Sequence, residues 1–127
     1  MKIRIKGNSL RYRLTKSDVD LLTRNGQVTE SIHFGSASLQ YELVVTKADH
    51  LSAAFHDNCI TVYFPASWIN NWVNTEEVGF TQIVAINNTP EGLTLVIEKD
   101  FTCLDKVSED QSDNYPNPLM KETYEHR

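Results

Sequence analysis

The chain has 127 residues, which is the size of one ordinary domain and leaves no room for a second independent core. Hydrophobic residues make up 40% and charged residues 23% of the chain, a composition typical of globular proteins that excludes a disordered or fibrous body. The formal net charge of −5 argues against nucleic-acid binding, because domains with that function are usually basic.

The first fourteen residues alternate between apolar and basic side chains. In residues 1–6 the apolar side chains stand at odd positions, and in residues 10–14 they stand at even positions. A period of two predicts β-strands with one basic face. The change of phase across Gly7-Asn8-Ser9 predicts either a bulge within one long strand or a tight turn into a partner strand.

A short helix is predicted to follow. Thr15 stands at the N-cap position and Asp18 three residues later, which is the spacing of a capping box with Asp in place of Glu. Asn25-Gly26 predicts a left-handed end to the helix. This helix is expected to cover one end of a sheet.

The rest of the chain up to Phe101 is dominated by strand patterns with short links. Alternating apolar residues, separated by turn residues, predict strands at 28–34, 39–45, 51–55, 60–64, 78–86 and 93–97, and a second short helix over 66–73. Because the links between successive strands are too short for a parallel crossover, antiparallel pairing is expected.

These elements indicate a mainly β (α+β) fold: an antiparallel barrel or strongly curved sheet with two short accessory helices. Residues 1–104 are predicted to form a single β-rich domain. Residues 105–127 are polar and acidic, which predicts an extended or partly ordered C-terminal tail.

A cytoplasmic location is expected. Charges interrupt the apolar residues at the N-terminus, and no stretch approaches the roughly 20 apolar residues of a membrane span. Cys59 and Cys103 belong to no CxxC pair and are expected to be reduced thiols. No membrane contact is predicted.

Two stretches of the sequence stand out: KIRIKGNSLR at residues 2–11 and, near the other end, EKDF at 98–101 with EDQSDN at 109–114. They resemble a family of small bacterial proteins that carry a domain of unknown function. The resemblance spans essentially the whole chain. It implies no activity, ligand or catalytic residue.

The first candidate binding site is the row of basic side chains in the opening strands. A solvated strand face, or a sheet edge protected by Lys and Arg, explains the same pattern. If the row is functional, it suits an anionic small molecule or an acidic segment of a protein partner. The row consists of Lys2, Arg4, Lys6, Arg11 and Arg13.

An alternative from a different class is a phosphate-directed enzyme. The basic row resembles the strands of tunnel enzymes that hydrolyse triphosphates inside an antiparallel barrel. Those enzymes begin with a strand of alternating Glu residues that bind metal, whereas Lys2, Arg4 and Lys6 occupy these positions here. The metal ligands of that chemistry are therefore not identified, and no catalytic residue or cofactor is predicted.

The acidic tail supplies a second candidate. Glu109, Asp110 and Asp113 carry oxygen ligands suited to Ca²⁺ or Mg²⁺, but their spacing is not that of an EF-hand loop, so they are weak metal candidates. The tail also suggests a homo-oligomeric structural protein in which the tail of one chain covers the basic row of another. Among these three functional alternatives, we expect a binding or protein-interaction module that presents the basic strand, rather than an enzyme.

Overall fold

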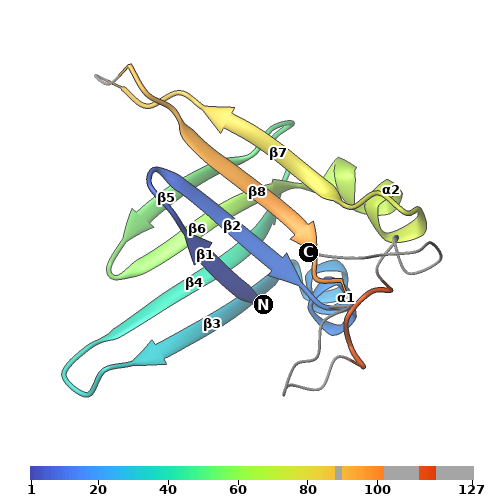
Figure 1. Ribbon diagram of the computed structural model, residues 1–127, viewed down its shortest axis with the longest axis horizontal. Helices are drawn as coiled ribbons and strands as arrows, with labels where there is room; N and C mark the ends of the chain where they lie inside the picture. Colours follow the sequence, from blue (N-terminus) through green and yellow to red (C-terminus); the bar gives the residue numbers. More distant parts are fainter. Residues whose placement is uncertain (88–89, 102–111, 117–127) are drawn as a thin grey trace, which may run out of the picture.

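The computed structural model describes residues 1–87, 90–101 and 112–116 (Figure 1). In chain order its elements are β1 (Lys2–Ile5), β2 (Ser9–Leu14), α1 (Lys16–Asn25), β3 (Gln27–His33), β4 (Ser38–Thr46), β5 (Ser52–His56), β6 (Cys59–Pro65), a 3₁₀ turn (Ala66–Trp68), α2 (Ile69–Asn74), β7 (Gly79–Val84) and β8 (Leu93–Lys99). The mainly β class with two short helices is confirmed. In this part of the chain, neither helix has the length or the apolar character needed to cross a membrane.

The strands form two four-stranded sheets that share one plan (Figure 1). The first sheet has the order β1-β2-β8-β7 and the second has the order β3-β4-β6-β5. Each sheet is made of two antiparallel hairpins whose second strands lie side by side in parallel. The described strands do not close into a barrel.

The expectation of purely antiparallel pairing is wrong at the centre of each sheet. β2 pairs in parallel with β8, and β4 pairs in parallel with β6. The argument from short links applies only to strands that follow one another along the chain. The entire second sheet separates β2 from β8, and β5 separates β4 from β6, so both parallel pairs have enough intervening chain.

The change of phase near the N-terminus is explained by a tight turn. Lys6 N donates to Ser9 O at 3.2 Å, and the pairing continues with Ile5 opposite Leu10. Gly7 has φ of 57°, the positive value that the first position of a type II′ hairpin turn requires. β1 and β2 are therefore neighbours rather than halves of one strand.

The first helix begins and ends at the predicted residues. Thr15 accepts from the Asp18 backbone, and the Asp18 carboxylate accepts from Thr15 N at 3.0 Å, which completes the capping box. Gly26 ends the helix in the left-handed conformation with φ of 82°. Asp18 also lies 3.0 Å from the Met1 ammonium, and Glu30 of β3 lies 2.7 Å from the same nitrogen. These contacts hold the start of β1 against α1 and the second sheet.

The core lies between the two sheets, and the helices close one end of it. β2 leads directly into α1, and β6 leads through the 3₁₀ turn into α2. Trp72 of α2 is fully buried and packs with Phe64 and Phe80. Trp68 packs against the same two rings, so the second helix covers the aromatic end of the core. The first residues of β2, β6 and β8 lie at the opposite end, away from both described helices (Figure 1).

Candidate binding surface on the first hairpin

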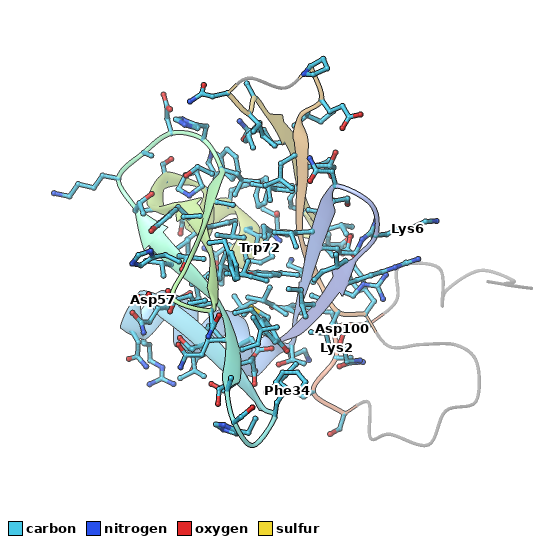
Figure 2. The ribbon with its side chains drawn as sticks, turned by 90° about the vertical axis from the view of Figure 1, so that its left-hand side faces the viewer. Lys2, Lys6, Phe34, Asp57, Trp72 and Asp100 are labelled. Atoms are coloured by element: carbon cyan, nitrogen blue, oxygen red, sulfur yellow. The ribbon has the colours of Figure 1, made fainter. Side chains whose placement is uncertain are left out.

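The hairpin of β1 and β2 brings the predicted basic residues together on one surface. Lys2 pairs with Arg13, and Arg4 pairs with Arg11. Directly opposite residues of an antiparallel pair lie on the same side of a sheet. Tyr12, between the two arginines of β2, is fully buried in the core, so the basic side chains face outward. Figure 2 shows Lys6 projecting away from the second sheet as well. We call Lys2, Arg4, Lys6, Arg11 and Arg13 the basic face.

The two arginines of β2 share one carboxylate. Glu98 of β8 accepts from Arg11 Nη1 at 3.0 Å and from Arg13 Nε at 2.8 Å through the same oxygen, Oε2. The Glu98 side chain is mostly covered, whereas both arginine side chains remain partly exposed. These ion pairs fix the two guanidinium groups over the sheet and offset part of their charge.

Lys2 faces a second carboxylate. Its ammonium lies 3.2 Å from Oδ2 of Asp100, and the Asp100 side chain is only 7% exposed (Figure 2). This oxygen is buried and accepts no hydrogen bond from a described residue, so the lysine charge compensates it through proximity rather than through hydrogen-bond alignment. The Lys2 ammonium is therefore held in an ion pair within the protein.

Arg4 and Lys6 differ from the other three basic residues. Both are exposed, and neither side chain forms an ion pair or hydrogen bond with another described residue. The basic face thus presents five cations and two carboxylates, and its uncompensated charge is concentrated at Arg4 and Lys6. A surplus of positive charge on an exposed surface attracts anionic groups.

The described part of the tail contacts its own domain. Asp113 O accepts from Lys16 N at 3.1 Å, and its Oδ1 accepts from the Ser17 hydroxyl at 3.2 Å, at the beginning of α1. A hydrogen bond from the Thr15 hydroxyl lowers the pKa of Asp113 despite opposing desolvation, with further help from Ser17. Asp113 therefore interacts with a helix N-terminus. The other weak metal candidates, Glu109 and Asp110, lie outside the described residues.

Within the described ranges, no group of three or more His, Cys, Asp or Glu side chains is arranged to hold a metal ion. Cys59 is a free thiol, and its sulfur lies 3.6 Å from the Thr61 hydroxyl. Cys103 lies outside the described residues.

An apolar pocket, which the sequence did not predict, lies between the two sheets at the end opposite the helices. Its volume is about 370 Å³, within the range of small-ligand sites. None of the basic-face residues is among its lining residues, which are Ile5, Gly7, Asn8, Ser9, Leu10, Ala53, Ala54, Phe55, Ile60 and Leu93. The sequence shows only that an apolar residue stands beside each hairpin turn. Whether these residues meet in one pocket depends on how far apart the two sheets lie at this end, which the sequence does not reveal.

Lys99 was also missed as a buried cation. It follows Glu98 in β8 but faces the opposite side of the sheet, where Nζ donates to Thr75 O at 2.9 Å and lies 5.0 Å from the centre of the Tyr115 ring. Burial lowers the pKa of Lys99, although Glu77 and Glu76 act in the opposite direction. The sequence does not indicate that a lysine at the end of a predicted strand is buried. Its burial becomes evident only from the tertiary structure, in which β8 pairs with β2.

Comparison with known proteins adds one assignment. Residues 1–119 match a family of unknown function, DUF7009. The chain belongs to the DUF7009 family. This confirms the resemblance to an uncharacterised family seen at both ends of the sequence. No curated protein and no solved structure matches the chain.

Proposed function

We propose that this DUF7009 protein is a recognition module whose basic face binds an acidic segment of a protein partner. The observation that carries this proposal is the division within the basic face. Glu98 and Asp100 compensate the cations nearest β8, whereas Arg4 and Lys6 have no partner among the described residues. Carboxylates that approach the exposed pair gain charge-assisted hydrogen bonds without displacing an internal partner.

The geometry gives less support to the two alternatives. A phosphate-directed tunnel enzyme needs its basic residues around an internal cavity, whereas the basic face lies on the outer side of the first sheet and lines no part of the apolar pocket. Tail exchange between copies needs a tail released from its own domain. Asp113 contacts α1 of the same chain, and Tyr115 forms a β-bridge with Phe101.

Charge reversal at Arg4 and Lys6 is expected to weaken binding of an acidic peptide at least tenfold. The suitable probe is a fluorescent oligoglutamate of about ten residues, followed by anisotropy at low salt. Each exposed ion pair contributes roughly 0.2–1 kcal/mol, and reversal replaces two attractions by two repulsions. The double variant Arg4→Glu/Lys6→Glu should therefore lose most of the affinity, and wild-type binding should weaken as salt increases.

The matched control is Lys16→Glu/Lys47→Glu, which changes net charge equally at exposed residues outside the basic face. It should bind the probe within about twofold of wild type. Equal weakening in both double variants would show that net charge, not the basic face, attracts the peptide. Displacement of the peptide by inorganic tripolyphosphate at much lower concentration than by glutamate oligomers would favour a phosphate ligand and overturn the proposal.

A further inference from the structure

The outer edge of β1 has unpaired main-chain groups. β1 is the first strand of its sheet, with β2 on one side only. Because Lys6 and Ser9 form a hydrogen-bonded pair and such pairs alternate along an antiparallel hairpin, Arg4 also directs its N–H and C=O toward β2. Ile3 and Ile5 direct theirs away from it. These four groups bind no other described residue.

An apolar surface of the second sheet lies beside this edge. Ile32 pairs with Leu39, and both stand an even number of residues from buried core positions on their own strands, so they face the first sheet. Yet Ile32 is 42% exposed, and Phe34 beyond it is 66% exposed. Figure 1 shows why: the end of the β3–β4 hairpin extends beyond the edge of β1. We call Ile32, Phe34 and Leu39 the apolar shelf.

The start of β1 is fixed close to this shelf. Met1 binds Glu30 through its ammonium and accepts a hydrogen bond from Tyr41 at 2.9 Å through its carbonyl oxygen. Glu30 and Tyr41 form the strand pair two residues before the pair of Ile32 and Leu39. A strand added to β1 therefore lies over the part of β3 and β4 that the first sheet leaves uncovered.

We propose that the acidic partner segment binds as an additional strand on the edge of β1. This inference rests on the proposed function and specifies the form of the ligand. Opposite Ile3 and Ile5, the segment places apolar residues that face the second sheet, where they cover the apolar shelf and the 58% exposed side chain of Ile5. Opposite Arg4 it places an acidic residue. The ligand is thus an extended segment in which acidic and apolar residues alternate.

The charge pattern makes a second copy of β1 a poor occupant of this edge. Pairing two copies of β1 brings Lys and Arg side chains of one copy beside those of the other, and like charges directly opposite one another destabilise a sheet. Basic residues on an edge strand generally prevent such association. The same residues favour a strand of opposite charge.

Two peptides of identical composition test whether the acidic segment binds as a strand. One alternates Glu and Val between Gly-Ser ends, and the other contains the same residues with Glu and Val in separate blocks. The alternating peptide should bind at least tenfold more tightly, because only it directs all Glu to one side and all Val to the other. Methylation of its main-chain nitrogens that face β1 should remove this advantage. Hydrogen exchange provides the structural readout: at saturation, the amides of Ile3 and Ile5 should exchange at least tenfold more slowly.

A variant of the apolar shelf separates strand addition from charge attraction. Ile32→Ser should weaken the alternating peptide severalfold and leave the blocked peptide unaffected. Ile83→Ser is the matched control, because Ile83 is also an exposed isoleucine but lies on the opposite edge strand, β7. It should leave both peptides unaffected.

The outcomes distinguish this inference from the proposed function. If both peptides bind equally, depend equally on Arg4 and Lys6, and leave the Ile3 and Ile5 amides unprotected, strand addition is wrong while acidic recognition stands. If neither peptide binds at low salt, both proposals are wrong. If the alternating peptide binds the Arg4→Glu/Lys6→Glu variant as tightly as wild type, strand addition stands without the acidic recognition.

Discussion

Replacing Trp72 with Ala is expected to lower the free energy of unfolding by about 3–5 kcal/mol, the range found when large aromatic residues are removed from a core. The Trp72 side chain is fully buried, its ring centre lies 5.3 Å from that of Phe64, and Nε1 donates to Val78 O at 3.2 Å. The variant therefore loses apolar burial and leaves the Val78 carbonyl without this donor. Equilibrium unfolding in urea measures the loss.

Val73→Ala is the matched control for that experiment. Val73 is the next residue of α2 and is exposed, so its truncation should change stability by no more than about 0.5 kcal/mol. Similar losses in the two variants would contradict the placement of α2 over the end of the core. Trp72→Phe should fall between Ala and wild type, because it keeps an aromatic ring and loses the indole donor.

Replacing Asp18 with Ala is expected to cost about 2–4 kcal/mol, which combines the loss of a helix cap with the loss of a partner from a buried ion pair. Asp18 is a buried carboxylate that accepts from Thr15 and lies 3.0 Å from the Met1 ammonium. Without it, α1 loses its capping box and Glu30 alone faces the ammonium. Urea unfolding at neutral pH gives the magnitude.

Asp20→Ala provides the control on the same helix. Asp20 is exposed and, among the described residues, forms an ion pair with Arg24 one turn later, an arrangement worth about 0.3–0.5 kcal/mol. A cost at Asp18 no greater than that at Asp20 would show that the contact between α1 and the start of β1 contributes little.

The pH dependence of stability tests the same cluster. Burial acts to lower the pKa of the Met1 ammonium, but hydrogen bonds to Glu30 and Asp18 outweigh it and raise the pKa above the ordinary value of 8.0. A group whose pKa rises on folding contributes its full stabilisation below its unfolded pKa and loses it as pH passes the folded value. Wild-type stability should therefore decline above pH 8. The decline should be smaller in Asp18→Ala, and equal declines would contradict the role of Asp18.

Local features of this fold could be predicted because neighbouring residues determine them. Thr15, Asp18 and Gly26 define α1 through hydrogen bonds and a backbone conformation that depend on a few adjacent positions. Asp57 and Asn58, both with positive φ, likewise form the short link between the strands predicted at 51–55 and 60–64. The outward direction of the basic residues follows from alternation alone, since Arg4 and Arg11 face outward whether a bulge or a turn joins their strands.

Only the basic residues of the candidate site could be predicted from the sequence. The five cations were identified, but the carboxylates that divide them into compensated and exposed groups were not. Glu98 lies 85 residues or more along the chain from Arg13 and Arg11, and no local pattern predicts that β8 enters the sheet beside β2. The unpaired edge of β1 and the exposure of the apolar shelf likewise depend on tertiary structure, because both follow from β1 being an edge strand of the first sheet.

By itself, the sequence determined the mainly β class, the two short helices, the turns and the side of the first strands on which Lys and Arg lie. These properties arise from side-chain periodicity and from hydrogen bonds within a few residues. Only the tertiary structure decided that β2 and β8 pair in parallel, that Glu98 and Asp100 compensate three of the five cations, and that Arg4 remains exposed beside an unpaired edge. Contacts between distant segments decide these features, because many arrangements of the same strands satisfy the local pattern, and tertiary packing selects the one in which Tyr12, Phe64 and Trp72 share a core.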